Sequence, residues 1–494
     1  MTALAILVVV LPLAPALATT LTARARPLGA LSASSGIAAL GVAVALAVHV
    51  GSGRRVTALS GFLYLDPLSV YFLATIAVVV ALASVGSAAY MRAEEQRGEL
   101  SPLQVRLYFI FFAIFASMML ASFETGNLGL LWVLIEASTL ASCVLVGLEG
   151  KSVSLEAAWK YIIISSFGVT IALVGTLFLY YAAGDLAGSP TQHLTWSYLY
   201  VHAAHLAPES LRLAFLLALI GYGTKVGLAP MHTWLPDAHS EAPSPASAML
   251  SAALLNTGMY AIIRFQALTR GALGTGYAAH ILLVFGFASV VIATLFIVLR
   301  GNYKRLFAYS SVEHMGIIAI ALGFGGVLGL YGALLHTLTH AIGKAVLFLT
   351  SGDLVLRYRS RLIDDVKGAL TVTPLTGAVL LLAALAVAGS PPFGLFLSEF
   401  TIIRAGLQRS SIVLVAALVV LLAIVFIALV GAAAGMALGD SPDRPTSGPA
   451  YPERSGRVLA AAPLIAGMAM LLLLGLWIPG GLDRLIMHSI HTIS

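Results

Sequence analysis

The sequence predicts an all-α, polytopic integral membrane protein with about fourteen transmembrane helices. Of its 494 residues, 60% are hydrophobic and only 10% are charged, and the mean hydropathy is +0.98. A soluble globular chain carries about 25% charged residues. Apolar runs of about 20 residues recur along the chain, and each can cross a bilayer as a helix. Membrane spans therefore account for most of the chain.

The predicted spans divide the chain into four parts. The spans are residues 2–20, 30–48, 64–90, 104–121, 127–147, 157–183, 211–228, 244–270, 276–299, 305–323, 327–357, 373–403, 411–438 and 458–478. Residues 1–100 hold the first three spans, 101–275 hold spans four to eight, 276–440 hold spans nine to thirteen, and 441–494 hold a loop and the last span. We predict that the two groups of five are inverted repeats, because they start on opposite sides of the membrane.

The N-terminal apolar stretch is predicted to be a membrane helix. Residues 2–18 end in Ala-Leu-Ala like a cleavable signal, but the positive charges Arg24 and Arg26 follow the stretch instead of preceding it. That order is the reverse of a signal peptide. We expect a first span with its N-terminus outside.

The basic residues support the same orientation. The predicted inner loops hold 17 Lys and Arg and the outer loops hold 8, which leaves only Lys225 and Lys344 inside helices. Cytoplasmic loops of membrane proteins carry the excess of positive charge. An even number of spans then places both termini outside a bacterial or archaeal cytoplasmic membrane. The inner-loop residues include Arg24, Arg92, Lys151, Arg300, Lys304, Arg357, Arg359, Arg361 and Arg457.

Two spans are predicted to be broken. The seventh runs into the segment 225–230 and then Pro236, and the twelfth contains the segment 389–394 with two adjacent prolines. Proline removes a backbone donor and clashes with the preceding turn, so freed carbonyls at membrane depth need a cavity, a side chain or water. Broken helices at corresponding places in two halves indicate a transport path.

The remaining composition excludes several classes of function. Cys143 is the single cysteine, so neither an internal disulfide nor a CxxC cluster for zinc or iron–sulfur can form. The net charge of +6 is scattered among short loops and does not indicate nucleic acid. The longer hydrophilic segments, 184–210 and 439–457, are predicted to be loops.

Charged residues inside spans mark the candidate site. Glu136 lies in the middle of the fifth span, and Lys225 lies just before the break of the seventh. A charge at the bilayer centre costs at least about 2.5–3.5 kcal/mol, so such residues are few, partnered and usually functional. The pair could be a static buried ion pair. It could equally be a switchable proton site, because the approach or withdrawal of a carboxylate changes how strongly an amine holds its proton.

The eleventh span presents His336, His340 and Lys344 at a spacing of four residues, which places them on one helix face. Two histidines one turn apart could bind a metal, but no acidic third ligand lies nearby in the sequence. Hydrogen bonds between helices are a second alternative. We prefer a proton relay, because imidazole exchanges protons near neutral pH.

Further polar residues extend this row. Glu313 and His314 lie in the tenth span and point about 100° apart on a helix, so they do not simply pair with each other. Asn256 in the eighth span cannot carry a proton charge but can hold a water. Glu399 follows the break of the twelfth span, where the alternative is an interfacial carboxylate. We predict a proton path along the membrane plane through Glu136, Lys225, Asn256, His340, Lys344 and Glu399.

Several motifs resemble one known family. The segment 225–245, KVGLAPMHTWLPDAHSEAPSP, resembles the signature of the antiporter-like subunits of respiratory complex I and of cation/proton antiporters. The segments at 302–317, 336–353 and 389–400 resemble the same family. The Glu313–His314 pair and LLNTGMY at 254–260 are most similar to hydrogenase-4 component F, a branch of membrane-bound group 4 nickel–iron hydrogenase complexes.

The resemblance implies roles for particular residues. Glu136, Lys225, His336, His340 and Glu399 occupy positions of the family's proton pathway. A second set is added by the same motifs: His232, Glu313, His314 and Lys344. The departure is Asn256, where many complex I relatives carry a lysine, so the central link here is uncharged.

The resemblance also implies partners and cofactors. The chain is expected to be a non-catalytic, proton-translocating subunit of a redox-driven hydrogenase-like or complex I-like assembly. It would bind other membrane subunits and a peripheral redox module, and it would itself hold no metal, heme or flavin. One alternative is a subunit of a multisubunit sodium/proton antiporter of the Mrp type. Another is a scaffold that has lost transport, which the uncharged Asn256 would favour.

Overall fold

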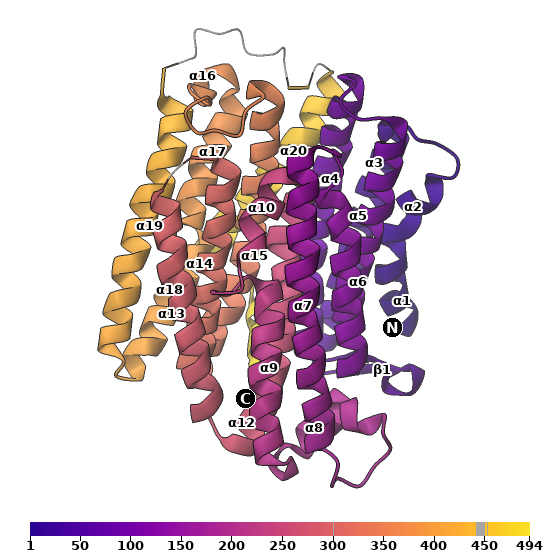
Figure 1. Cartoon of the computed structure of the whole chain (residues 1–494), viewed down its shortest axis with the longest axis vertical. Helices are drawn as coiled ribbons and strands as arrows, with labels where there is room; N and C mark the ends of the chain where they lie inside the picture. Colours follow the sequence, from indigo (N-terminus) through magenta and orange to yellow (C-terminus); the bar gives the residue numbers. More distant parts are fainter. Residues whose placement is uncertain (300, 441–449, 452) are drawn as a thin grey trace.

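The computed structural model describes residues 1–299, 301–440, 450–451 and 453–494, and these residues form a bundle of long helices (Figure 1). Within this described part, eleven helices are long and apolar enough to cross a membrane. They are α3 (Ala25–Gly51), α4 (Pro67–Gln96), α5 (Pro102–Ser122), α6 (Leu128–Val146), α7 (Ser152–Ala182), the continuous run Ser244–Leu273, α13 (Gly276–Val298), α14 (Tyr303–Phe324), α15 (Gly326–Tyr358), α19 (Ile412–Leu438) and α20 (Arg454–Leu476).

The other three predicted spans coincide with helices that are short, interrupted or richer in charged residues. The first comprises α1 (Thr2–Val10), η1 (Leu11–Leu13) and α2 (Ala14–Ala18), which are separated where Pro12 and Pro15 fall. The seventh is α9 (Pro208–Val226), and the twelfth is split into α17 (Pro374–Val387) and α18 (Gly394–Gln408). Every predicted span therefore corresponds to helical structure, and the all-α class is confirmed.

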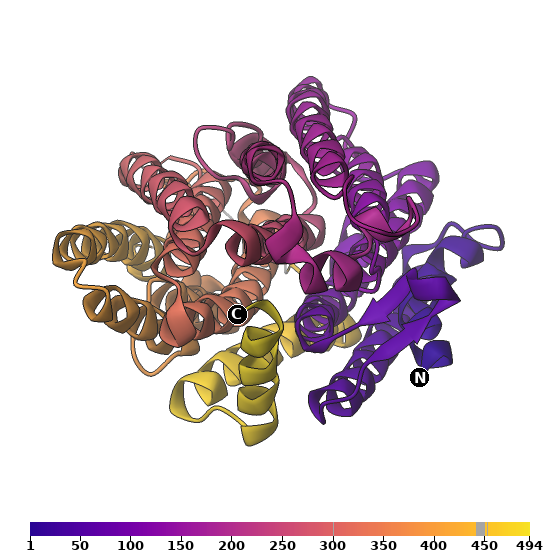
Figure 2. The ribbon, with the colours of Figure 1, turned by 90° about the horizontal axis from the view of Figure 1, so that it is seen from below.

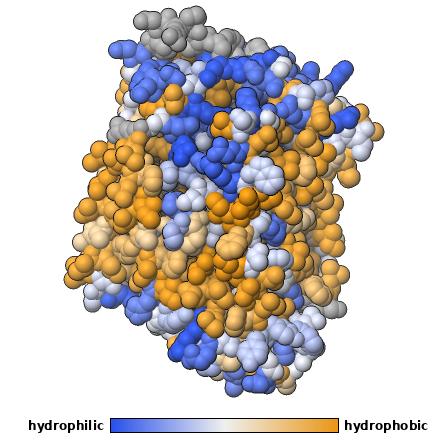
Figure 3. Space-filling view, in the orientation of Figure 1, coloured by the Kyte–Doolittle hydropathy of each residue, from blue (hydrophilic) through white to orange (hydrophobic). Residues whose placement is uncertain are grey.

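An apolar band crosses the visible face of the bundle (Figure 3). Hydrophobic residues dominate the middle of the visible face, and hydrophilic residues gather at its upper and lower ends. Residues 101–275 are called the first half below, and residues 276–440 the second half. Exposed large apolar side chains occur on long helices of both halves, for example Phe167 on α7, Val284 on α13 and Val420 on α19. Such a surface is stable only when lipid or another membrane protein covers it.

Helix α15 forms the centre of the bundle. It is 33 residues long and packs against α14, α17, α18 and α20, and also against α4 from the N-terminal part. Seen from below, the helices of residues 101–275 and those of residues 276–440 lie on opposite sides, and the C-terminal helices close one face next to the N-terminal ones (Figure 2). The central helix thus connects all parts of the chain.

Glycines allow the closest helix contacts. In the first half, a Cβ added to Gly168 or Gly221 would come within 3.0 Å of atoms on the facing helix of the α7–α9 pair. In the second half, Gly286 on α13 and Gly316 on α14 face each other in the same way, with 2.8 Å from an added Cβ to the opposite carbonyl oxygen. Small residues at helix contacts are typical of membrane bundles, where close van der Waals packing stabilises association.

Several elements were not predicted from the sequence. Residues 56–65 form a small antiparallel hairpin, β1 (Val56–Ala58) and β2 (Leu63–Leu65). The predicted loop 184–210 contains η3 (Gln192–Leu194), α8 (Trp196–Val201), η4 (Ala203–His205) and the start of α9. The C-terminus adds α21 (Gly480–Ile493). Three short elements, η2 (Leu59–Gly61), α10 (Trp234–Glu241) and α16 (Ala369–Val372), were also not predicted. The predicted eighth span consists of α11 (Ser244–Met249), η5 (Leu250–Leu254) and α12 (Leu255–Leu273).

The expectation that only Lys225 and Lys344 lie inside helices is wrong. Arg264 of α12 is buried and makes two bonds of 2.7 Å to Asp66, the residue that caps the N-terminus of α4. Lys304 is also buried, near the start of α14. The count missed Arg264 because it lies near the end of an apolar run. Arg300 and residues 441–449 and 452 of the predicted 439–457 loop lie outside the described residues.

Candidate functional site: a buried row of ionisable side chains

Lys225 occupies the last turn of α9, where the helix breaks. The helix ends because Gly227 adopts a left-handed conformation with φ of 80°. Lys225 is 0% exposed, and its Nζ donates to Thr139 Oγ1 at 2.5 Å and to Tyr161 Oη at 3.0 Å. Its amine is therefore held by two neutral hydroxyl groups.

Glu136 lies on α6, one turn before Thr139. Its Oε1 accepts a hydrogen bond of 2.6 Å from Ser166 of α7, and its Oε2 is buried without a partner among the residues that the structure describes. Among the described residues, no carboxylate lies within 4.0 Å of the Lys225 Nζ. The structure therefore brings Glu136 and Lys225 to the same region without a direct ion pair. Thr139, which binds Lys225, lies on the same helix as Glu136, one turn further along.

Two histidines lie in the segment that follows the break. His232 is mostly buried, its Nδ1 has no partner among the described residues, and its ring centroid is 6.2 Å from that of Tyr309. His239 of α10 is fully buried, and neither ring nitrogen has a partner in that part of the chain. The His239 ring stacks on Phe348 at 5.1 Å. We did not single out His239 from the sequence, although it lies in the quoted motif at 225–245.

Asn256 lies just after a π-helical turn, η5, that interrupts the eighth span. Its Nδ2 donates to the Ala252 carbonyl one turn earlier at 2.7 Å, while its Oδ1 is buried with no partner in the described chain. A π-turn in a membrane helix is frequently found at functional sites. The Oδ1 of Asn256 can therefore still accept a hydrogen bond. Among the described residues, Asn256 has no hydrogen bond to another residue of the predicted pathway.

Lys344 and Glu313 form the centre of the second half. Lys344 Nζ donates to the Phe307 carbonyl at 3.0 Å and to Ser310 Oγ at 2.6 Å, both on α14. Glu313 is on the same helix, is buried, and has one carboxylate oxygen without a partner among the described residues. The two side chains interact electrostatically. This arrangement resembles the first half, where a buried lysine is held by neutral oxygens and a carboxylate lies nearby.

Three histidines form a cluster next to this lysine. His314 Nδ1 and His336 Nε2 are 3.0 Å apart, and His336 Nδ1 is 2.9 Å from Ser398 Oγ. The rings of His314 and His340 have centroids 5.1 Å apart, and both nitrogens of His340 lack a partner in the described chain. The histidines of α14 and α15 therefore meet the start of α18.

Glu399 lies on α18 at the far end of the row. It is 8% exposed and borders a hollow of about 430 Å³ that apolar residues of α18 and α19 line. Its carboxylate is close to the cluster, because ligand atoms of His314, His336 and Glu399 lie within 4.8 Å of one another. No acidic residue lies near His336 and His340 in the sequence, but the fold brings Glu399 next to His314 and His336.

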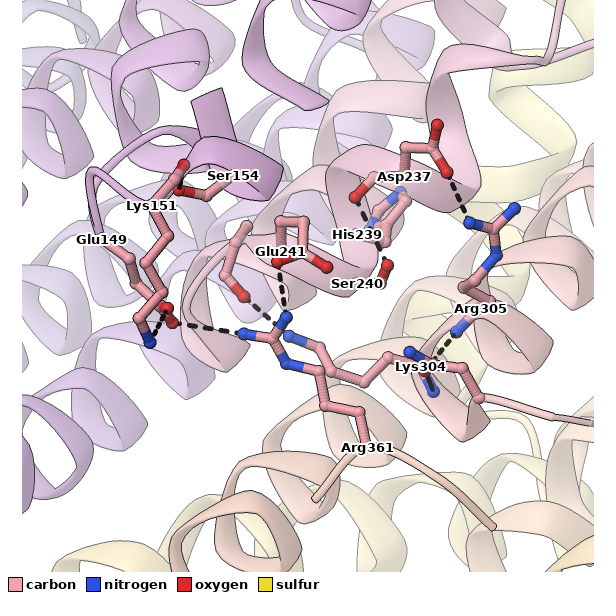
Figure 4. A network of polar contacts seen from close by, with 12 residues as sticks. Glu149, Lys151, Ser154, Asp237, His239, Ser240, Glu241, Lys304, Arg305 and Arg361 are labelled. Carbon is pink, nitrogen blue, oxygen red and sulfur yellow. Dashed lines mark hydrogen bonds and ion pairs between the residues drawn. The ribbon is translucent and has the colours of Figure 1, made fainter. Parts of the chain in front are cut away.

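A network of ion pairs joins the segment before α7, the end of α10 and the segment after α15 (Figure 4). Arg361 donates to Glu241 at 2.6 Å and to Glu149 at 3.2 Å, and Lys151 donates to Glu149 at 2.7 Å. The hydrogen bond from Lys151 to Glu149 raises the pKa of the Lys151 ammonium. Lys304 reaches into this network, and its Nζ donates to the Ala242 carbonyl at 2.7 Å. From the sequence, Lys151, Lys304 and Arg361 were expected only to be basic residues of the inner loops.

The geometry defines a class of protein. Two buried lysines, each held by neutral oxygens near a carboxylate, lie in two halves of a helical membrane bundle. Among the described residues, imidazole nitrogens near the second lysine and the amide oxygen of Asn256 have no hydrogen-bond partner. Intramembrane ionisable residues of this kind mark ion or proton pathways. The fold and the site define a polytopic, ion-translocating type of membrane protein.

Comparison with known proteins agrees with this class. The profile of the family described as NADH:quinone oxidoreductase/Mrp antiporter, transmembrane, matches residues 125–425, and the chain belongs to this family. The match spans the whole row from Glu136 to Glu399. The predicted family is thus confirmed.

Individual relatives cover most of the chain. The hydrogenase-4 component F homolog of Methylacidiphilum infernorum is 38% identical over 383 residues, which are 77% of this chain and 80% of that protein. A chain of an archaeal membrane-bound sulfane sulfur reductase has the same fold, with a TM-score of 0.84, 23% identity and coverage of 99% and 97%. A chain of the Mrp complex from Dietzia gives a TM-score of 0.84 at 22% identity, with the same coverage.

Proposed function

We propose that the chain is a proton-translocating membrane subunit of a redox-driven assembly of the hydrogenase or complex I type. The observation that carries the proposal is Lys225, which is completely buried at a helix break and contacts Thr139 and Tyr161 instead of a fixed counter-charge. A lysine in this state can accept and release a proton, whereas a direct ion pair would hold the ammonium form.

The first half loads the proton. A charged Glu136 side chain near Lys225 stabilises the ammonium, and a withdrawn or neutral Glu136 favours the neutral amine. The unpaired Oε2 of Glu136 and its single bond to Ser166 leave this side chain few constraints. Movement of one carboxylate therefore changes the protonation of Lys225.

The second half receives the proton and passes it on. The free Oδ1 of Asn256 can hold a water between the halves, and His340, Lys344 and the His314–His336 pair offer proton carriers at short range. Imidazole transfers protons near neutral pH. Glu399 lies at the end of the row and borders an open hollow, so the proton leaves there. Glu313 and His232 are secondary groups next to this path.

The chain acts with other subunits and carries no redox centre of its own in this proposal. Its relatives include a hydrogenase-4 component F homolog and a chain of an archaeal respiratory membrane complex. A separate redox module would supply the energy, and sibling membrane subunits would cover the apolar faces. The predicted location is a bacterial or archaeal cytoplasmic membrane with both termini outside. A reporter fused after Ser494 that works only in the cytoplasm would contradict this orientation.

The Mrp-type alternative differs in the ion that is moved. The same fold occurs in the Mrp complex from Dietzia, so a sodium/proton antiporter subunit is the second candidate. Sodium is a hard cation that needs several oxygen ligands. The described row contains more nitrogen groups than carboxylates, which favours protons.

Transport by the whole complex in proteoliposomes separates these functions. We expect proton transport that requires turnover of the redox module and does not depend on sodium. This proton transport should be lost in the Lys344→Gln variant. Lys160→Gln is the matched control, because Lys160 is a half-exposed lysine on α7 that pairs with Glu156 at 2.6 Å. Sodium-dependent transport would favour the antiporter, and full coupling in Lys344→Gln would contradict the proposed path.

A further inference from the structure

The cluster of His314, His336 and Glu399 has the composition and the dimensions of a metal site. One ligand atom from each residue lies within 4.8 Å of the other two, and all three side chains are buried. Zinc is held at about 2.0–2.2 Å by imidazole nitrogen and carboxylate oxygen. Two ligands of one tetrahedral ion are therefore about 3.3 Å apart. The His314–His336 nitrogen pair, at 3.0 Å, is close to that separation.

Ser398 fixes the ring of His336 in the form that a ligand needs. The Ser398 hydroxyl donates its proton to the Leu395 carbonyl at 2.7 Å, so its oxygen is an acceptor for His336 Nδ1 at 2.9 Å. His336 then carries its proton on Nδ1 and presents a free lone pair on Nε2. Histidines that bind metals almost always donate their other ring N–H in this way, which sets the tautomer and the ring orientation.

Unpartnered groups next to the cluster provide a second observation. His314 Nε2 and both nitrogens of His340 are buried without a hydrogen-bond partner in the described part of the chain. A buried polar group without a partner is destabilising, and a bound ion would supply the missing partner. The His340 ring is 5.1 Å from that of His314, so His340 or a water can supply the fourth position of a tetrahedral site.

We propose that His314, His336 and Glu399 form a binding site for a divalent transition-metal ion of the zinc class. The two imidazoles and one carboxylate are a borderline-soft donor set that suits such ions better than sodium, calcium or magnesium. Glu399 also borders the hollow of about 430 Å³ next to the break between α17 and α18. An ion at this place occupies the nitrogen pair that the proposed proton path uses.

Binding of Zn²⁺ to the purified whole complex, measured by competition with a chromophoric chelator, tests the site without any assay of transport. We expect the wild-type complex to bind one additional Zn²⁺ per copy of this chain. The complexes with Glu399→Gln or His314→Gln should lack this additional Zn²⁺. Co²⁺ substituted for Zn²⁺ should give the intense visible absorption of a tetrahedral centre, and this absorption should be missing in the same two variants.

A non-ligand variant separates binding from damage to the fold. Ser398→Ala removes only the group that orients His336, and we expect it to weaken Zn²⁺ binding about 10–100-fold. Ser489→Ala is its matched control, because Ser489 is equally buried and its hydroxyl, within the described part of the chain, bonds only to the Leu485 carbonyl of its own helix. His239→Gln, which removes an unpartnered buried histidine elsewhere, should leave binding unchanged. Equal Zn²⁺ binding by wild-type, Glu399→Gln and Ser398→Ala complexes would overturn the proposal.

Discussion

The buried ion pair between Asp66 and Arg264 is predicted to be a major determinant of stability. Arg264 and Asp66 are 2% and 0% exposed and share two bonds of 2.7 Å. Asp66 Oδ1 also accepts from the Ser69 backbone at 2.9 Å, and Arg264 donates to Tyr260 Oη at 2.9 Å. The pair joins the start of α4 to α12 and thereby connects the N-terminal helices to the first half.

Replacing Arg264 with Met leaves the Asp66 carboxylate buried and uncompensated. Removal of one partner of a buried pair destabilises a protein by about 3–5 kcal/mol. That change corresponds to a loss of about 100- to several-thousand-fold in the ratio of folded to unfolded protein. Far-UV circular dichroism of the purified protein in detergent, followed during denaturant titration, measures the difference in the free energy of unfolding.

Two further variants make this prediction specific. Asp66→Asn combined with Arg264→Met should recover much of the loss, because Asn removes the charge and still caps α4. Arg212→Met is the control, since the Arg212–Glu209 pair is exposed by 48% and 84% and should contribute about 0–1 kcal/mol. Equal stability of Arg264→Met and Arg212→Met would refute the reasoning.

The remaining predictions concern the site and its surroundings. Lys225→Arg should abolish pumping by the complex without loss of assembly, because a guanidinium does not release its proton in this range. Tyr161→Phe should slow pumping only in part, since Lys225 keeps its second hydroxyl partner. Gly475→Ala should disrupt the break between α17 and α18, where an added Cβ would collide with the backbone, whereas Gly435→Ala meets no atom within 4 Å and should be tolerated in a thermal unfolding assay. Burial raises the pKa of Glu124, in the loop between α5 and α6, to about 9. Unfolding releases that proton, so stability should fall as the pH rises from about 4.5 to 9, and Glu124→Gln should remove this part of the pH dependence.

The transmembrane framework could be predicted because lipid imposes strong rules on a sequence. Long apolar runs must form helices whose backbone groups are satisfied internally. Both breaks were also readable, since Pro230 after the seventh span and the proline pair at 391–392 remove backbone donors and clash with the preceding turn. The hairpin at 56–65 was missed because its strands are short, and helix α21 was missed because it is amphipathic and contains no long apolar run.

The candidate site could be predicted only as a set of residues. The types and spacing of Lys225, His336 and His340 identified them as intramembrane polar groups. Their partners could not be inferred, because Thr139 and Tyr161 are ordinary residues that reach Lys225 only through tertiary packing. For the same reason, the sequence indicated neither the proximity of Glu399 to the histidines nor the pairing of Arg264 with Asp66.

Proton translocation by the complete complex in proteoliposomes, with Lys225→Ala and Glu136→Gln variants of this chain, tests the proposed proton pathway most directly. A pH-sensitive dye inside the vesicles reports the number of protons moved per turnover of the redox module. We expect both variants to assemble and to keep redox activity while this ratio falls, and Asn256→Ala to have a milder effect because water can fill the gap. A normal ratio in both Lys225→Ala and Glu136→Gln would contradict the account and would leave these two residues a structural role only.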